Sequence, residues 1–225
     1  MTKNYCIKEG YQCNLNKHGQ SVSFYSDNKK DSSSYQVAVY QFAAGLIKSN
    51  KLNSVLDIGC GIGLKLKKYV YPFCKDITGI DVEQHINFCK KHYNFGYWLI
   101  EDIELPKMQL DKKFDIIIAS DVIEHLRDPN KLFSYIRRHA ANDTYVIIST
   151  PERDLVQGEY SFGPPSNKAH IREWNMAEFS EYIKKMNFEI INHFLVQDKK
   201  LSFLKQVKRF FRISKTCQVV LCSVR

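Results

Sequence analysis

The sequence predicts an α/β protein in which a doubly wound, mostly parallel sheet of seven strands carries helices on both of its faces. Strand-like and helix-like segments alternate through most of the chain, which is typical of parallel sheets. Residues 116–118 and 146–148 are continuously apolar, as central strands buried on both faces require. A glycine-rich turn after the first strand, at residues 59–63, indicates a ligand site at one edge of this sheet.

Local patterns place each element in turn. Residues 1–30 are polar and indicate an irregular N-terminal arm, and apolar side chains at helical spacing follow a helix-start signal at residues 31–34. Further helices are expected at 63–70, 83–92, 130–140 and 175–186, the last with Asn175 as its cap. Strands are expected at 53–58, 76–81, 97–100, 114–120, 144–149, 188–196 and 218–224.

We expect one domain over residues 1–225. Its 44% hydrophobic and 25% charged residues are ordinary for a folded globular chain. Residues 151–174 combine proline and glycine with aromatic and ionisable side chains and lack periodicity. A loop of this length in a compact domain is usually functional, so we expect it on the substrate side of the sheet.

The cysteines and the N-terminus predict a cytoplasmic protein. No apolar stretch approaches the length of a membrane span, and the first residues lack the apolar core of a secretion signal. The seven cysteines form no Cys-x-x-Cys pair, which favours reduced thiols. Cys6, Cys13 and His18 match no zinc spacing, so no metal site is expected.

The net charge of +9 is partly local, because seven of the 33 basic residues fall within residues 199–215. Leu204, Val207 and Phe211 share one face of this basic insertion before the last strand, so the segment is amphipathic. Such a segment could lie on an anionic membrane surface or pack on its own domain or a partner subunit. Peripheral membrane contact and oligomerisation therefore stay open, whereas no nucleic-acid-binding motif accompanies the charge and nucleic acid is not an expected partner.

The glycine turn indicates the kind of ligand. Gly59, Gly61 and Gly63 alternate just after Asp57. This spacing differs from the dinucleotide fingerprint, which needs its third glycine at residue 64, and it lacks the Lys-Ser/Thr pair of a triphosphate loop. An acid before the turn would repel a pyrophosphate but could accept a hydrogen bond from an ammonium or balance a sulfonium. The turn therefore suits a phosphate-free, positively charged nucleoside cofactor, a description that S-adenosylmethionine meets.

A second acid supports this interpretation. Asp81 ends the next strand-like run, 24 residues after Asp57. Carboxylates at the end of the second strand hold ribose hydroxyls in doubly wound sheets. Alternatively, Asp81 caps the helix that follows it, and both roles can hold together.

Four ordered motifs resemble those of the class I S-adenosylmethionine-dependent methyltransferases: residues 55–63, Asp81, residues 101–103 and residues 114–126. The resemblance extends over about residues 50–196, and the four motifs in order are far more specific than any one alone. It implies a Rossmann-like methyltransferase fold with S-adenosylmethionine as the cofactor.

The resemblance also implies a role for each cofactor-site residue. The three glycines let the backbone approach the methionine and ribose. Asp57 would bind the amino group and Asp81 the ribose hydroxyls. Asp102 and Ile103 lie where the family contacts adenine. Ser120 and Asp121 lie under the methionine portion.

The catalytic candidates are His125, His170 and Asp121. His125 follows the fourth strand, where an imidazole could accept a proton at neutral pH, or else pack and fix the loop. His170 lies close in sequence to Arg172 and Glu173. These two are expected to bind a polar or anionic acceptor, Arg172 by a bidentate contact. Alternatively, the group is a helix-entry cluster whose charges pair with neighbours. Tyr160 completes the expected substrate residues.

A narrower resemblance concerns the acceptor. Residues 149–154, 163–165 and 170–174, with residues 35–36 and 39–40, look like a branch of small methyltransferases encoded among surface-polysaccharide (capsule) biosynthesis genes. This resemblance implies O- or N-methylation of a sugar, a sugar nucleotide or a glycan substituent. Two alternatives stay open: an acceptor on RNA or protein, and a methyltransferase fold that serves as a non-catalytic scaffold.

Overall fold

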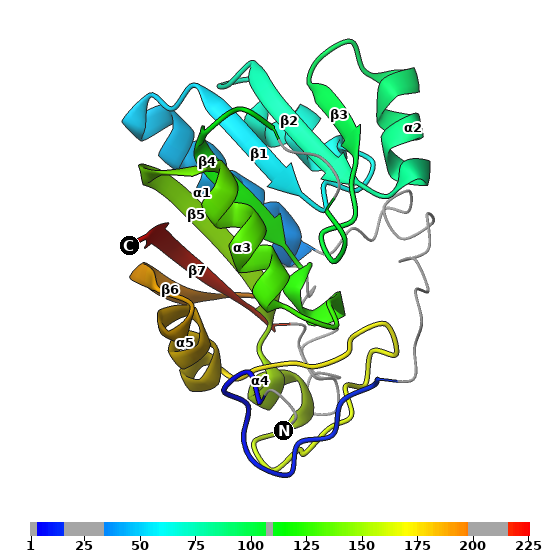
Figure 1. Ribbon diagram of the computed structural model, residues 1–225, viewed down its shortest axis with the longest axis vertical. Coiled ribbons are helices and arrows are strands. Elements are labelled where there is room, and N and C mark those ends of the chain that lie inside the picture. Colours follow the sequence, from blue (N-terminus) through cyan, green and yellow to red (C-terminus); the bar gives the residue numbers. More distant parts are fainter. Residues whose placement is uncertain (1–3, 16–33, 107–109, 198–215) are drawn as a thin grey trace, which may run out of the picture.

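The computed structural model describes residues 4–15, 34–106, 110–197 and 216–225. Within these ranges, seven strands form one sheet in the order β3-β2-β1-β4-β5-β7-β6, in which only the pairs that involve β7 are antiparallel (Figure 1). The doubly wound, mostly parallel sheet that the sequence predicts is therefore confirmed. The strands are β1 (Ser54–Ile58), β2 (Asp76–Asp81), β3 (Tyr97–Ile100), β4 (Phe114–Ser120), β5 (Ala140–Pro151), β6 (Phe188–Gln197) and β7 (Thr216–Val224).

Helical segments lie between the strands, and three of them differ from the sequence prediction. The expected helix at 63–70 is a π-helix over most of its length. A short 3-10 helix, η2, follows β4 where no helix is expected, and the expected loop at 151–174 contains a short helix, α4. A glycine with positive φ, Gly158, ends α4. The segments are α1 (Ser34–Asn50), η1 (Leu66–Val70), α2 (Glu83–His92), η2 (Ile123–His125), α3 (Asn130–His139), α4 (Arg153–Gln157) and α5 (Met176–Lys185).

Strand β5 begins four residues before the sequence prediction, at Ala140 instead of residue 144. Ala140 pairs with Phe114, and the register then shifts before the regular pairing resumes. The Thr144 hydroxyl stabilises this irregularity, because it donates to Phe114 O at 2.6 Å and accepts from the Ala141 amide at 2.8 Å. Polar residues at 142–143 hide the start of the strand in the sequence.

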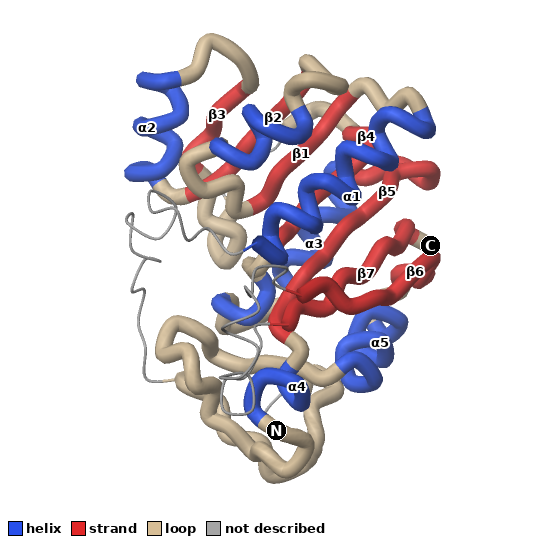
Figure 2. The backbone as a smooth tube through the Cα atoms, turned by 180° about the vertical axis from the view of Figure 1, so that it is seen from behind, coloured by secondary structure: helices blue, strands red, loops and turns tan. Residues whose placement is uncertain are grey.

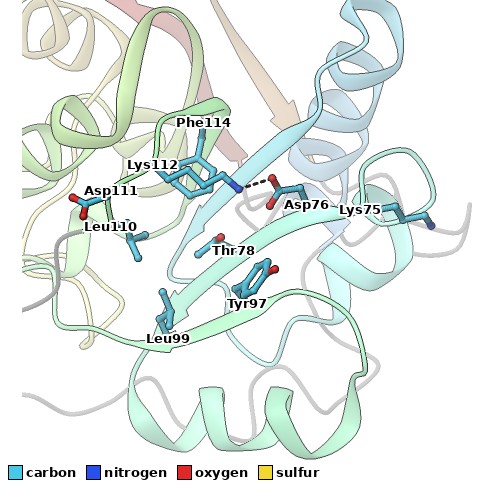
Figure 3. Close-up of a pocket in the computed structure, with 9 residues that line it drawn as sticks. All are labelled: Lys75, Asp76, Thr78, Tyr97, Leu99, Leu110, Asp111, Lys112 and Phe114. Carbon is cyan, nitrogen blue, oxygen red and sulfur yellow. Dashed lines mark hydrogen bonds and ion pairs between the residues drawn. The ribbon is translucent and has the colours of Figure 1, made fainter.

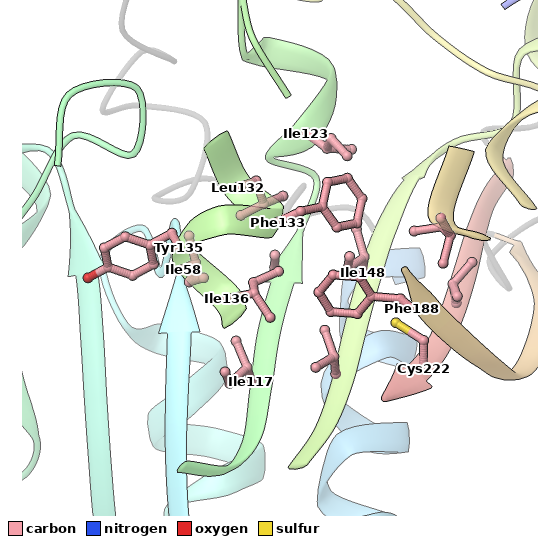
Figure 4. Close-up of a cluster of buried hydrophobic side chains, with 14 of the residues drawn as sticks. Ile58, Ile117, Ile123, Leu132, Phe133, Tyr135, Ile136, Ile148, Phe188 and Cys222 are labelled. Carbon is pink, nitrogen blue, oxygen red and sulfur yellow. The ribbon is translucent and has the colours of Figure 1, made fainter. Parts of the chain in front are cut away.

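The sheet buries side chains on both faces, as the apolar strands require. In β4, Ile116 and Ile118 face the layer of α1, η1 and α2, whereas Ile117 and Ala119 face the layer of α3 and α5. Figure 1 shows α3 in front of the sheet, and Figure 2 shows α1 in front of it from behind. The α3 layer includes Phe133 from α3 and aromatic and aliphatic side chains from the strands (Figure 4).

The described part of the N-terminal arm, residues 4–15, runs along the loop at 151–174 (Figure 1). The Gln12 amide donates to Phe162 O at 2.7 Å, and the Asn14 amide donates to Ile171 O at 2.9 Å. The indole of Trp174 donates to Tyr5 O at 3.0 Å. Residues 16–30 of the expected arm and the basic insertion at 199–215 lie outside the described residues, and no described helix is long and apolar enough to cross a membrane.

A buried arginine fixes the loop to α5. Arg153 is fully buried, and its guanidinium donates to both carboxylate oxygens of Glu178, at 2.5 and 3.0 Å. Glu178 also forms a capping box with Asn175, the cap that the sequence predicts. The carboxylate therefore closes the start of α5 and holds the loop at the same time.

Candidate functional site

The carboxyl ends of β1 and β4 lie side by side and bring two predicted segments together. Ile58 pairs with Ala119 in the parallel register, so the glycine turn and the segment after Ser120 leave the sheet next to each other. A Cβ on Gly59 would lie 2.5 Å from Cγ2 of Val122. The contact is therefore so close that only glycine fits at residue 59.

The glycine turn adopts the conformation that its residues allow. Gly59, Gly61 and Gly63 have φ of 74°, 57° and 69°, in the left-handed region that L-residues with a Cβ avoid. The amides of Gly59 and Cys60 donate to Ile80 O at 2.9 and 3.1 Å. These bonds fasten the turn to the end of β2.

Asp81 ends β2 and connects the turn to α2. Its Oδ2 accepts a hydrogen bond from the Gly61 amide at 2.7 Å, and its Oδ1 accepts from the Val82 amide at 2.7 Å. Nδ1 of His85 lies 2.9 Å from the same Oδ1. A carboxylate has about four lone-pair sites, so these contacts leave capacity for a ribose hydroxyl.

The other cofactor candidates border the same edge of the sheet. Asp57 is fully buried in β1 and accepts a hydrogen bond from the Tyr40 hydroxyl of α1 at 2.8 Å. Asp102 is exposed and Ile103 is buried, directly after β3. Ser120 ends β4, and its hydroxyl lies 2.9 Å from that of Ser149 in β5. Their contacts with a cofactor remain predictions.

Asp121 has positive φ, 55°, and its carboxylate is held by two segments that are distant in sequence. Gln36 of α1 donates to its Oδ2 at 2.7 Å, and the Ser149 hydroxyl donates to its Oδ1 at 3.2 Å. Neither Gln36 nor Ser149 is a predicted site residue. Nothing in their local sequence indicates that they meet Asp121.

A buried acid lies beside the two predicted histidines. Glu124 is fully buried, and its Oε2 accepts a hydrogen bond from the Thr150 hydroxyl at 3.0 Å. Burial raises the pKa of Glu124 to about 8, and the charge of Asp121 adds to the rise, whereas His170 opposes it. Sequence reasoning missed this residue, although it stands directly before His125.

His125 and His170 meet although 44 residues separate them in sequence. Their ring centroids lie 4.8 Å apart in a T-shaped arrangement. Nδ1 of His125 lies 3.0 Å from Ala169 O, and Nδ1 of His170 lies 2.5 Å from Glu173 Oε1. Burial lowers the pKa of His125, which favours the neutral imidazole. The structure therefore joins the two histidines among the catalytic candidates in one polar cluster.

The substrate candidates are placed less favourably for acceptor binding. Arg172 is 2% exposed, and its guanidinium donates to Leu126 O at 2.6 Å and to Arg127 O at 3.0 Å. Glu173 is buried and bonded to His170 and to Gln157. These contacts match the alternative of a helix-entry cluster. The two guanidinium nitrogens of the expected bidentate contact donate to backbone carbonyls here, and contact of Arg172 with an acceptor stays a prediction.

Tyr160 has the opposite placement, because it is 88% exposed on the loop after α4. The neighbouring Glu159 carbonyl accepts from the Lys8 ammonium at 2.8 Å. The loop is therefore held by the N-terminal segment, while the Tyr160 ring stays in solvent.

A separate cavity of about 670 Å³ lies near the start of β2 and β4 (Figure 3). Figure 3 shows Thr78 and Tyr97 on one side of it and Leu110 and Phe114 on another. None of its lining residues is a predicted site residue, and it includes Asp76 at the first position of β2, whereas Asp81 stands at the last. The cavity is therefore not part of the candidate site.

The doubly wound sheet and the glycine turn at its carboxyl edge are typical of methyltransferases. The model of a family described as a methyltransferase domain matches residues 28–193. The chain therefore belongs to this family of S-adenosylmethionine-dependent methyltransferases. A solved structure of a plantazolicin methyltransferase, BpumL, bound to S-adenosylhomocysteine (SAH) has a TM-score of 0.61 at 19% identity, covering 88% of both chains. An S-adenosylmethionine-dependent methyltransferase from Clostridium acetobutylicum reaches a TM-score of 0.64 at 15% identity, covering 89% of this chain and 96% of that one.

Curated relatives are similar over part of the chain. A probable S-adenosylmethionine-dependent methyltransferase of Mycolicibacterium smegmatis is 26% identical over 60% of this chain and 52% of its own length. Ajmaline N-methyltransferase of Rauvolfia serpentina is 31% identical over 52% of this chain and 43% of its own. A ubiquinone biosynthesis O-methyltransferase of Dictyostelium discoideum is 24% identical over 43% of this chain and 35% of its own. The chain thus spans about half, or less, of the relatives that it matches.

Proposed function

We propose that this chain transfers the methyl group of S-adenosylmethionine to an oxygen or nitrogen of a small polar acceptor. One observation carries the proposal. The glycine turn lies against Val122, which directly follows Asp121 in the chain and precedes Glu124 and His125, and His125 meets His170. A cofactor on the turn would therefore have its methionine portion beside these side chains. The SAH bound to plantazolicin methyltransferases of the same fold supports S-adenosylmethionine as the donor.

Methyl transfer is an in-line displacement, so most of the catalysis is positioning. The turn and Asp81 would hold the methionine and ribose portions of the cofactor, and the polar cluster would hold the acceptor. An acceptor hydroxyl must also lose its proton. The Nδ1–H of His125 is directed at Ala169 O, so its Nε2 carries the lone pair that a general base requires.

We take the acceptor to be a sugar, a sugar nucleotide or a glycan substituent, as in surface-polysaccharide biosynthesis. Support comes from the resemblance of residues 149–154 and 170–174 to that branch. Three relatives are named otherwise, for ubiquinone biosynthesis, for ajmaline and for phosphoethanolamine. An RNA or protein acceptor and a non-catalytic scaffold are the competing proposals, and the intact turn with both acids speaks against the scaffold.

SAH release, measured against a panel of sugar nucleotides, glycan fragments, small phenols and amines, and short RNAs, tests the proposal. We expect turnover with at least one carbohydrate-type acceptor and none with RNA. Turnover with RNA alone would overturn the acceptor class. Absence of SAH binding to the wild-type protein, measured by calorimetry, would overturn the proposal that this chain is a methyltransferase.

A further inference from the structure

Glu124, His125 and His170 form a group that the methyl-transfer proposal uses only in part. Each residue offers one ligand atom, and these atoms lie within 4.8 Å of one another. Glu124 and His170 are buried, whereas His125 is partly exposed. The group is therefore buried on the side of Glu124 and His170 and partly exposed at His125.

The hydrogen bonds fix the tautomer of both imidazoles. The Ala169 carbonyl can only accept, so the Nδ1 of His125 that faces it at 3.0 Å carries the proton. The Nδ1 of His170 faces Glu173 Oε1 at 2.5 Å and carries its proton for the same reason. The Nε2 of each ring then carries the lone pair, and in His170 it accepts from the side-chain amide of Asn167 at 2.8 Å. A carbonyl or carboxylate behind Nδ1 is the arrangement that orients histidines which bind metal through Nε2.

The carboxylate of Glu124 supplies an independent observation. Its Oε2 is bonded to Thr150, but among the described residues its buried Oε1 has no hydrogen-bond partner. Instead, Oε1 lies 4.0 Å from Nε2 of His170. A buried carboxylate oxygen normally has a partner, and burying it without one is costly. A cation between Oε1 and the two imidazoles would meet this need.

We propose that Glu124, His125 and His170 bind a divalent first-row transition-metal ion. Two imidazoles with one carboxylate suit Mn²⁺, Fe²⁺, Co²⁺ or Zn²⁺, whereas Mg²⁺ and Ca²⁺ favour oxygen ligands. Neighbouring ligands about 2.1 Å from an ion lie about 3 Å apart, so binding draws the three atoms together by about 1–2 Å. Nε2 of His170 then exchanges its 2.8 Å contact with the Asn167 amide for the ion. No metal site follows from the sequence, because Glu124 is not among the residues that it singles out.

Three protein ligands would leave coordination positions on the ion for the acceptor. This role of the ion in methyl transfer rests on the proposed function. An acceptor hydroxyl bound to the ion loses its proton to water more readily. The oxygen then attacks the methyl carbon, the C–O bond forms, the C–S bond breaks with its electron pair on sulfur, and SAH leaves. In this scheme His125 is a metal ligand and not the base. The following experiments decide between the two roles.

Binding of Co²⁺ to the metal-free full-length protein, followed by visible absorption, tests the site without any activity. We expect one tightly bound ion in the wild type. Glu124→Gln, His125→Gln and His170→Gln should each weaken binding by more than about 100-fold, since even partners of ligands cost 10–100-fold. His193→Gln is the matched control, because His193 is a half-buried histidine of β6 bonded to Gln218, and it should bind like the wild type.

Two results would overturn the site: no tight Co²⁺ binding by the wild type, or binding that survives all three substitutions in folded protein. Intense thiolate-to-metal absorption would assign the ion to cysteine and would also overturn it. Glu173→Gln adds a positioning test, with an expected loss of about 10-fold in Co²⁺ affinity and retained folding.

Chelation separates this inference from the proposed function. With an acceptor found by SAH release, turnover should fall after chelation and return with Mn²⁺ or Co²⁺, while SAH affinity stays unchanged. Full turnover in the metal-free protein would overturn the metal and support His125 as the base. Tight Co²⁺ binding together with no acceptor in the panel would leave the metal site standing and overturn the carbohydrate class.

Discussion

The two halves of the sheet's carboxyl edge are built by different means. Between β1 and β3, the candidate cofactor site consists of backbone: three glycines with positive φ and two amides held by Asp81. Between β4 and β5, the candidate acceptor site consists of buried and partly buried side chains. Gln36, Glu124 and His170 come from three different segments of the chain.

The difference teaches where each half is vulnerable. The backbone half depends on conformations that only glycine adopts at low cost, so a single methyl group should disturb it. The side-chain half depends on buried hydrogen bonds that lose their partners when one group is removed. The four substitutions that follow test this contrast, from the largest expected effect to the smallest.

Gly59→Ala should have the largest effect. Its Cβ would meet the stiff, β-branched side chain of Val122 at 2.5 Å, and its φ of 74° is unfavourable for alanine. Backbone strain of about 1–3 kcal/mol adds to an overpacking cost of about 1–3 kcal/mol. We expect a clear drop in unfolding free energy by denaturant titration and loss of SAH binding by calorimetry.

Gly158→Ala is the matched control for that substitution. Gly158 also has positive φ, 94°, but nothing lies within 4 Å of the position of its Cβ. Its ψ of 148° places it in a region that is essentially restricted to glycine, so Gly158→Ala should lose stability through backbone strain alone and SAH affinity should not change. A loss of SAH affinity in Gly158→Ala as large as that in Gly59→Ala would contradict a specific role of the contact between the turn and Val122.

Arg172→Met should be next, with a loss of about 2–4 kcal/mol in unfolding free energy. The substitution leaves the carbonyls of Leu126 and Arg127 buried without their charged donor. The exposed neighbour Arg127 is the control, and Arg127→Met should stay within about 0.5 kcal/mol. If Arg172 instead binds the acceptor, its loss would raise the acceptor KM at unchanged stability.

Asp81→Asn should weaken SAH binding by about 10–100-fold, because charge-assisted bonds to the Gly61 and Val82 amides are worth about 1.5–3 kcal/mol each. Co²⁺ binding at Glu124 should be unaffected, since the two halves are separate. Asp76→Asn, at the other end of β2, should leave both affinities unchanged. Unaltered SAH affinity in folded Asp81→Asn, measured by calorimetry, would contradict the assignment of Asp81 to the cofactor site.

Tyr160→Ala should have the smallest effect on the fold. A side chain that is 88% exposed contributes within about 0.5 kcal/mol. Any effect should therefore appear in the acceptor KM alone. Phe162→Ala is the comparison, because the Lys8 ammonium lies 4.4 Å from the Phe162 ring, and it should lower stability by about 1 kcal/mol. A loss of stability in Tyr160→Ala would contradict the exposed placement.

The sequence predicts the features that depend on neighbouring residues. The strand, the turn and the acid at 55–63 are contiguous, and their glycines report the positive φ directly. The cap at Asn175 is also local and is confirmed. The sheet follows from the alternation of segments, since parallel strands need crossovers of this length.

The acceptor half could not be predicted in the same way. Glu124 is a charged residue that no local pattern marks as buried, and Gln36 reaches Asp121 across 85 residues. The sequence around Arg172 does not distinguish a guanidinium that binds an anion from one that binds two backbone carbonyls, as it does here. Each of these roles is set by tertiary packing, which a single sequence does not express.

The position of β7 has a consequence for synthesis on the ribosome. β7 lies between β5 and β6, so β6, although translated earlier, has no place in the sheet until residues 216–224 emerge. Until then the backbone edge of β5 is unpaired, and α5 can pack on α3, through Tyr182 and Asn130, but not on a β6 that is held in the sheet. Glu178 of α5 holds Arg153 near the start of the loop at 151–174. Strand β7 thus completes the acceptor half only after β1 to β6 have been made, whereas the cofactor turn can form as soon as β4 has been made.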